Sequence, residues 1–189
     1  MPRAFDPYIV PTMSIRKYNT ISPVIAAGAW VDEAAVVIGD VTIAEDVSIW
    51  PMVVARGDVN WIRIGARTNV QDGSVLHVSH DSSFAPGGYP LSIGADVTIG
   101  HKAVVHGCTI EDRCLIGMSA TVMDGAVVRS GAMVGAGSLV PPGQDVEGGY
   151  LWVGTPARRV RPLREQERDF LDYSAKHYVD LKNEYLSAR

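Results

Sequence analysis

The chain has 189 residues, a formal net charge of −4 and a hydrophobic content of 47%. This length suits one domain with an appendage. The absence of a basic excess argues against nucleic acid or an anionic membrane as a partner, and no apolar run is long enough to span a bilayer. Only two cysteines are present, and no charged-then-apolar leader opens the chain. We therefore expect a cytoplasmic protein without a disulfide framework.

The first 20 residues are expected to form an N-terminal extension, and the segment up to residue 12 precedes a second methionine, Met13. From Ile25 onward, an aliphatic residue recurs every six positions. The period slips once after Ala55, is interrupted by an insertion after Leu76, and loses one residue after Val105. The ladder positions are Ile25, Val31, Val37, Ile43, Ile49, Ala55, Ile64, Val70, Leu76, Ile93, Ile99, Val105, Ile110, Ile116, Val122, Val128, Val134 and Val140. Ala55 is the only position that is not Ile, Val or Leu, so the repeat is not a chance pattern.

A six-residue period is neither that of an α-helix nor that of a simple alternating strand. It predicts a short strand and a tight corner in each repeat, with one aliphatic side chain pointing into a narrow core. Three repeats close a triangular coil, so residues 21–145 are predicted to form an all-β parallel β-helix of about six coils. The pattern resembles the left-handed β-helix of the hexapeptide-repeat superfamily. The left hand is taken from that resemblance, because it departs from the usual crossover preference.

Three segments lie outside this regular repeat. A loop near residues 79–92 is expected to bulge from one corner, and residues 146–162 form a Gly/Pro-rich exit. Residues 163–189 are predicted to form a C-terminal helix, with Pro162 near its start. Five residues recur at helical spacing on it. They are expected to pack against a face of the same coil or of a neighbour's coil, with a partner surface as the alternative: Phe170, Ser174, Tyr178, Leu181 and Tyr185. His177, on the same helix, is expected to be a surface residue.

The ladder also places three histidines. His77 follows Leu76 and His106 follows Val105, so the two occupy the same offset on the same face of adjacent coils. Adjacent strands lie about 4.8 Å apart, which allows two imidazoles to hold one ion. His101 lies on another face and points away from this pair. The spacing therefore predicts a metal site that His101 of a neighbouring chain completes in a threefold oligomer.

Other polar residues fall at defined places on the same two faces. Arg56 is predicted to lie directly beneath His77, and Asp72 directly beneath His101, with Gln71 and Asp58 nearby. Arg56 of one chain would then lie level with Asp72 of the next, where an ion pair fixes the interface without necessarily adding stability.

Three histidines with an open fourth position are typical of catalytic zinc, which makes hydroxide available at neutral pH. Gln71 is placed to hold that hydroxide or a substrate oxygen, and Asp58 and Asp72 to orient side chains around it.

The stretch "ARGDVNWIRIGARTNVQDGSVLHVSH", followed by "IGHKAVVHG", resembles the γ-class carbonic anhydrases and their bacterial hexapeptide-repeat relatives. The resemblance implies a homotrimer with zinc, or alternatively iron or cobalt, between chains. It makes His77, His101 and His106 the metal ligands and implies reversible hydration of CO2 to bicarbonate. It also assigns the polar residues of the active site and interface, which are Gln71, Arg56, Asp58 and Asp72.

Two departures from the family pattern bear on activity. Val59 stands where the archetypal enzyme has a glutamate after its RGD motif. The loop after His77 has Asp81 as its only acid, whereas the family carries a proton-shuttling glutamate there. We therefore expect low turnover. His80, beside Asp81, is either a substitute shuttle or a solvated loop histidine.

Three other functions compete with CO2 hydration. One is an acyltransferase that uses an acyl-CoA donor, an activity that needs a single histidine base. Another is a catalytically weak, metal-stabilised trimeric scaffold, and the third is a small thioester hydrolase. Cys108 and Cys114 are expected to be buried and to take no part in chemistry.

Overall fold

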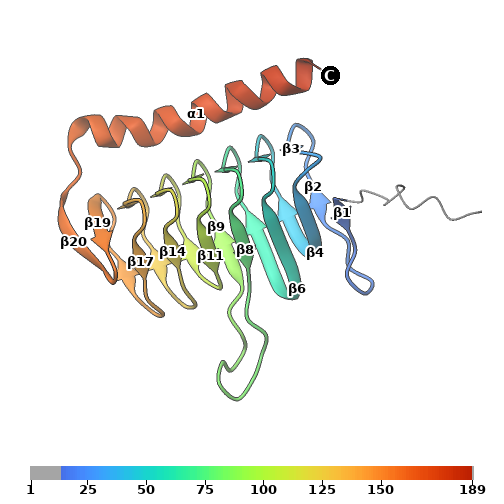
Figure 1. Ribbon diagram of the computed structural model, residues 1–189, viewed down its shortest axis with the longest axis horizontal. Coiled ribbons are helices and arrows are strands. Elements are labelled where there is room, and N and C mark those ends of the chain that lie inside the picture. The colour runs from blue at the N-terminus through green and yellow to red at the C-terminus, as the bar shows by residue number, and fades with distance from the viewer. Residues whose placement is uncertain (1–13, 189) are drawn as a thin grey trace, which may run out of the picture.

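The computed structural model describes residues 14–188 and consists of a triangular solenoid of short strands with one C-terminal helix (Figure 1). The expected left-handed parallel β-helix is confirmed. Of the expected N-terminal extension, residues 1–13 lie outside the described residues. Within residues 14–188, no helix is both long and apolar enough to cross a membrane.

The solenoid has three flat faces, and each face is a sheet of stacked strands that pair in parallel. The first face contains β1 (Ile15–Arg16), the start of β4 (Val36–Ile43), the start of β6 (Val54–Ile64), β8 (Val75–His77), β11 (Val104–His106), β14 (Thr121–Val122) and β17 (Leu139–Val140). The second face contains β2 (Val24–Ile25), the ends of β4 and β6, β9 (Leu91–Ile93), β12 (Thr109–Ile110), β15 (Val127–Val128) and β18 (Asp145–Val146). The third face contains β3 (Trp30–Val31), β5 (Ser48–Ile49), β7 (Asn69–Val70), β10 (Thr98–Ile99), β13 (Leu115–Ile116), β16 (Met133–Val134) and β19 (Tyr150–Gly154).

Each face therefore has seven strands in register, one more than the six coils expected. The repeat continues beyond both ends of the ladder that the sequence displays. Ile15 pairs with Val37 at the first end, and Trp152 pairs with Val134 at the other. After β19 the chain turns back, and β20 (Ala157–Pro162) pairs antiparallel with β19. The Gly/Pro-rich exit is therefore a β-hairpin that closes the end of the solenoid.

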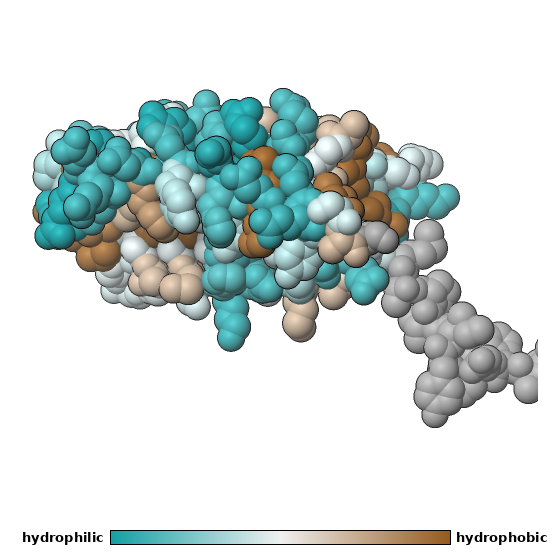
Figure 2. Space-filling view, turned by 90° about the horizontal axis from the view of Figure 1, so that it is seen from above, coloured by the Kyte–Doolittle hydropathy of each residue, from teal (hydrophilic) through white to brown (hydrophobic). Residues whose placement is uncertain are grey.

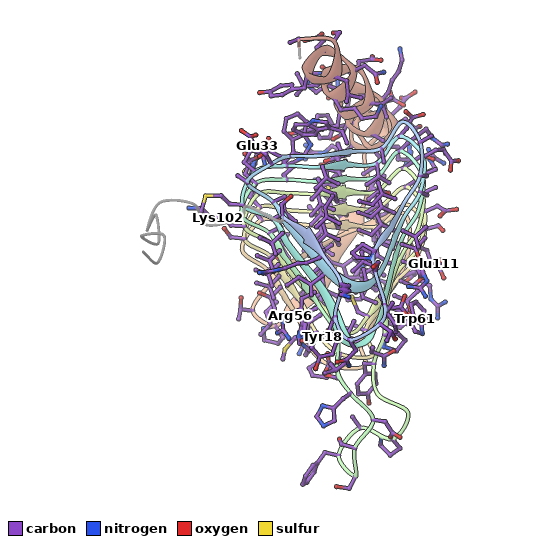
Figure 3. All side chains as sticks on the ribbon, turned by 90° about the vertical axis from the view of Figure 1, so that its right-hand side faces the viewer. Tyr18, Glu33, Arg56, Trp61, Lys102 and Glu111 are labelled. Carbon is purple, nitrogen blue, oxygen red and sulfur yellow. The ribbon has the colours of Figure 1, made fainter. Side chains whose placement is uncertain are left out.

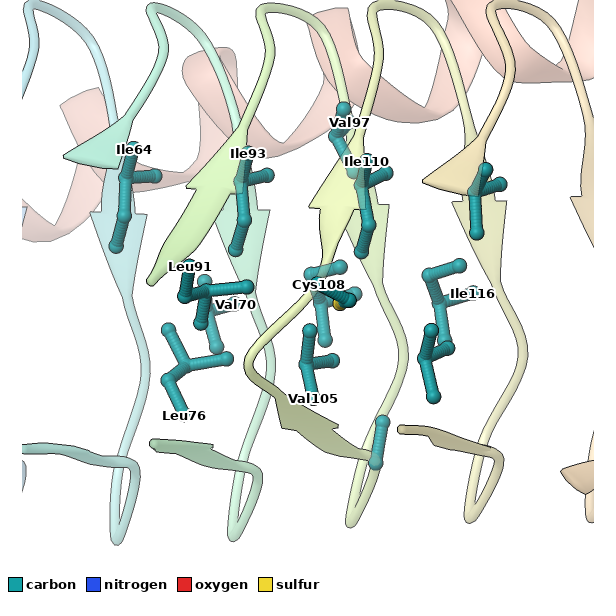
Figure 4. Close-up of a cluster of buried hydrophobic side chains, with 14 of the residues drawn as sticks. Ile64, Val70, Leu76, Leu91, Ile93, Val97, Val105, Cys108, Ile110 and Ile116 are labelled. Atoms are coloured by element: carbon teal, nitrogen blue, oxygen red, sulfur yellow. The ribbon is translucent and has the colours of Figure 1, made fainter. Parts of the chain in front are cut away.

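The ladder residues form the core because each one points inward from its strand. Ile64, Ile93 and Ile110 stack above one another on the second face, and each is almost completely buried (Figure 4). Coils approach so closely at the corners that a Cβ added to Gly117 would lie 2.4 Å from the backbone nitrogen of Ala136. Burial of one aliphatic residue per strand supplies the main stabilisation of such a fold.

Helix α1 (Glu165–Ser187) lies along the third face (Figure 1). The ring of Tyr178 lies 5.4 Å from that of Trp50, and the ring of Tyr185 lies 5.2 Å from that of Trp30. The hydroxyls of Ser174 and Thr98 are 2.9 Å apart. The helical stripe therefore packs on the third face of its own chain, although Phe170 and Tyr185 at its two ends keep about half of their surface exposed.

Candidate metal centre

Two histidines meet on the first face, at the ends of β8 and β11. His77 and His106 are direct partners in the parallel ladder, as the six-residue spacing predicts. Nδ1 of His77 lies 3.0 Å from Nε2 of His106. Two ring nitrogens at this separation are held together by one shared proton or by one cation. The solenoid thus presents two imidazoles side by side on a rigid sheet.

Carboxylates hold the outer nitrogens of both rings. Nε2 of His77 lies 3.2 Å from an oxygen of Asp58, and Nδ1 of His106 lies 2.5 Å from an oxygen of Asp124. The second oxygen of Asp124 accepts a hydrogen bond of 2.7 Å from Ser79. Carboxylate–histidine pairs of this kind orient metal-ligating imidazoles and raise their basicity.

Asp124 was not among the candidate residues. Its signal was present in the sequence, because Val122 lies directly above Val105 in the ladder. Asp124, two residues later, therefore lies at the corner above His106. A search for carboxylates beside each histidine, one coil above and one below, would have found it.

Electrostatics favour a charged Asp58 and a neutral His77. Burial opposes ionisation of Asp58, but hydrogen bonds from Arg56 and His77 outweigh it and lower the pKa of the carboxyl. Burial lowers the pKa of His77, and the hydrogen bond with Asp58 opposes this only in part. The neutral imidazole is the form that binds metals.

Arg56 does not extend freely toward a neighbour. Its Nη1 lies 2.5 Å from the carboxylate of Asp58, so its ion-pair partner is on the same strand. Whether it also lies level with Asp72 of another chain stays a prediction. In this position Arg56 orients Asp58, which in turn holds His77.

His101 lies at a different vertex of the triangular cross-section. It begins the corner after β10, and its neighbour Lys102 and Arg56 lie near opposite ends of the first face (Figure 3). Nδ1 of His101 lies 2.9 Å from the carboxylate of Asp72, one coil below, as the ladder predicts. Within residues 14–188 of one chain, no three histidine, cysteine or acidic side chains converge to hold an ion.

Gln71 lies close to His101 and is only 6% exposed. Its amide nitrogen donates a hydrogen bond of 3.0 Å to Asn69, whose own amide nitrogen donates to Thr98. This chain of hydrogen bonds fixes the side chain of Gln71. A fixed amide beside an imidazole is suited to binding a small polar molecule.

A groove runs between helix α1 and the His101 vertex, and we call it the α1 groove. Gln71 and His101 line one end. Along its length the lining is mainly apolar and aromatic, and includes Leu115, Met118, Met133, Phe170 and Tyr173. Figure 2, seen from the helix side, shows hydrophobic surface left visible beside the hydrophilic residues of this side.

The remaining candidate residues are not gathered at the histidine pair. Val59 is exposed, His80 is exposed in the loop between β8 and β9, and Asp81 accepts a hydrogen bond from the backbone of Gly87. Both cysteines are buried, as expected, and burial raises the pKa of the Cys114 thiol to about 12. His177 stacks on Tyr173, with 5.7 Å between the ring centroids, and it also lines the α1 groove.

The donor set fits a divalent transition metal such as zinc. All three candidate ligands are imidazoles, and each has a carboxylate at one ring nitrogen: Asp58 for His77, Asp72 for His101 and Asp124 for His106. Neutral imidazoles with carboxylate partners suit zinc, iron or cobalt far better than calcium or magnesium, which prefer oxygen ligands. The set is incomplete within one chain.

Comparisons with known proteins agree with this architecture. A family model described as the hexapeptide repeat of succinyl-transferase matches residues 107–141. Protein YrdA of Escherichia coli (strain K12) is 55% identical over 172 residues, which cover 91% of this chain and 94% of that protein. Gamma carbonic anhydrase 1, a mitochondrial protein of Arabidopsis thaliana, is 46% identical over 85% of this chain and 58% of its own length. A solved structure of a hexapeptide transferase family protein from Anaplasma phagocytophilum matches with a TM-score of 0.83 and 39% identity, covering 90% of this chain and 97% of that one.

Proposed function

Because this chain belongs to the γ-class carbonic anhydrase-like family of hexapeptide-repeat proteins, we propose that it binds zinc between subunits of a homotrimer and hydrates CO2 reversibly to bicarbonate. The observation that carries the proposal is the distribution of three carboxylate-held imidazoles. Two of them face each other at 3.0 Å on the first face, and the third lies at a separate vertex. A site that needs all three must use two chains.

A threefold rotation satisfies this requirement. His101 lies between His77 and His106 along the chain, in the coil that joins them, so all three have nearly the same height on the solenoid. Rotation about an axis parallel to the solenoid keeps these heights equal. It brings the His101 vertex of one chain to the His77–His106 pair of the next. Closure after three chains gives three equivalent sites.

The side chains around the site divide the work of CO2 hydration. His77, His106 and His101 of a neighbouring chain would hold the zinc ion, which would supply a nucleophile at neutral pH by lowering the pKa of water to about 7. The amide of Gln71, fixed through Asn69, orients the reacting water or a CO2 oxygen. Asp58, Asp72 and Asp124 hold the imidazole rings. Arg56 keeps Asp58 ionised, so this carboxylate continues to accept the hydrogen bond of His77.

We expect removal of the proton released by CO2 hydration to limit the rate at this site. Val59 has no titratable group, and Asp81 already accepts a backbone hydrogen bond within its loop. We therefore expect slow turnover that rises with the concentration of an imidazole-type buffer, since the buffer accepts the proton that the protein does not carry away.

Metal analysis and stopped-flow CO2 hydration on one anaerobically purified sample test the proposal. We expect one metal ion per chain and measurable hydration, both strongly reduced by His101→Ala. His177→Ala is the matched control, because it removes an imidazole that lines the same groove without being a proposed ligand. Bound metal with no hydration in any buffer would favour a metal-stabilised scaffold instead. Metal-free protein that transfers acyl groups from coenzyme A would refute the proposal.

A further inference from the structure

The loop between β8 and β9 projects from the solenoid (Figure 1). It carries an almost fully exposed aromatic side chain. Phe84 is 97% exposed. The loop is nevertheless held by its own hydrogen bonds. The backbones of Ser79 and Tyr89 exchange two hydrogen bonds of 3.0 Å, and the backbones of Ser82 and Ala85 exchange two hydrogen bonds of 3.1 Å. The loop therefore presents Phe84 in a defined position, so that binding through it costs little further ordering.

The α1 groove offers an apolar site of suitable chemistry. Met118 is 56% exposed and Tyr173 is 61% exposed, although both line the groove. Its floor includes three stacked glycines, which leave room between the helix and the His101 vertex: Gly100, Gly117 and Gly135. An aromatic ring lying there would contact sulfur and aromatic groups, which are favourable partners for it.

The loop and the groove lie at the same height on the solenoid. The loop starts directly after His77, and the groove starts beside His101 in the coil that follows. A rotation that brings His101 of one chain to His77 of another therefore also brings the groove of the first chain to the level of the loop of the second.

The direction of the loop fits as well. It leaves the vertex between the first and second faces and points away from the side that bears α1 (Figure 3). When a neighbour's His101 vertex contacts the His77 end of the first face, the neighbour's third face turns toward the departing loop. The helix of that neighbour then lies beside it.

From this placement, which rests on the proposed trimer, we infer that the β8–β9 loop of each chain inserts Phe84 into the α1 groove of the next chain. The occupant of the groove is thus a named segment of a second copy of this chain. The contact covers Met118 and Tyr173 and closes the groove on the side of Gln71 and His101. Each metal site would then be shielded from bulk water by the chain that supplies His77 and His106.

Engineered thiols test the contact in the zinc-loaded, full-length protein. The double variants Phe84→Cys/Tyr173→Cys and Phe84→Cys/Met118→Cys are treated with a short bis-maleimide and separated under denaturing conditions. We expect covalent dimers and trimers from at least one double variant and only monomers from the three single variants. The native cysteines give no background, because both are buried.

Light scattering, metal content and hydration measured on the same samples separate this inference from the proposed function. A trimer with bound metal and hydration, but without cross-links at either groove position, would overturn the docking of Phe84 and leave the proposed function intact. A monomer would overturn both.

Binding of the dye ANS gives an independent measurement. If Phe84 fills the groove, Phe84→Ala should increase ANS fluorescence several-fold in a protein that remains trimeric. Ser83→Ala, an exposed neighbour in the same loop, is the control and should leave the fluorescence unchanged. Equal fluorescence for Phe84→Ala and the wild type would contradict the inference.

Discussion

Asp124 is expected to control metal affinity although it is not a proposed ligand. Its carboxylate lies 2.5 Å from Nδ1 of His106 and also accepts a hydrogen bond from Ser79. Both side chains are partly buried, with 33% of His106 and 28% of Asp124 exposed, so solvent screens the interaction less than it would a fully exposed pair. Loss of such a partner typically costs about 10- to 100-fold in metal affinity.

The two obvious substitutions of Asp124 should differ. Asp124→Ala removes both hydrogen bonds and should weaken zinc binding by about 100-fold, or about 2.8 kcal/mol. Asp124→Asn keeps one oxygen that can accept from His106, but it loses the charge and places an amide NH2 where the oxygen that accepts from Ser79 had been. The Ser79 hydroxyl can turn to accept from this NH2, so a smaller loss of zinc affinity, about tenfold or about 1.4 kcal/mol, is expected.

The assay is competition for zinc with a chromophoric chelator at constant pH. Asp145→Asn is the control, since that carboxylate pairs with Arg129 on an exposed surface of the second face. The reasoning would be refuted if both Asp124 variants bound zinc as tightly as the control. It would also be refuted if Asn were worse than Ala.

Three further predictions concern stability and reactivity. Leu76→Ala, at a fully buried ladder position, should lower the free energy of unfolding by about 2–5 kcal/mol in urea titrations, and a loss below 1 kcal/mol would contradict the packing argument. Cys108 and Cys114 should not react with Ellman's reagent at pH 8 in the native protein, and both should react in urea, because burial raises the pKa of both thiols. The ion pair with Arg161 and the backbone amide of Arg164 lower the pKa of Glu167 from its usual 4.5 to about 2. Its stabilising effect is therefore complete above pH 4.5 and is lost as the pH falls toward 2, so Glu167→Gln should be less stable than the wild type at pH 6 and equal to it near pH 2. The free energy of unfolding of both proteins is measured by urea titration at each pH. A difference between Glu167→Gln and the wild type that stayed constant with pH would contradict this account of Glu167.

The spacing of residues along the chain determined most of the repeat architecture. Burial of one aliphatic residue per short strand is a local requirement, so a period of six fixes which residues point inward and which residues stack. The pairing of Leu76 with Val105 and of Val70 with Ile99 follows directly, and with it the contact of His77 with His106. The proximity of Asp72 to His101 has the same origin.

The periodicity could not say which face the helix covers, because the three faces are equivalent in their inward pattern. Trp30 and Trp50 flank the third face, and only the folded chain shows that Tyr178 and Tyr185 pack on them. The choice of this face creates the groove beside His101. It arises from side-chain shape at the surface, which a six-residue pattern does not encode.

Contacts that arise where corners and insertions meet were also decided by tertiary structure alone. Asp124 reaches His106, one coil below it, and Ser79, in the loop that begins two coils below it, because that loop returns toward the corner after β14. Likewise, Arg56 binds Asp58 because both extend from the same side of β6, a strand long enough to turn the corner. The sequence by itself determined the ladder and the level of each histidine, because inward packing repeats along the chain. The tertiary structure decided the partners of those histidines. Contacts of outward-pointing side chains depend on where the corners, the β8–β9 loop and the helix lie in the folded chain, which the six-residue period does not specify.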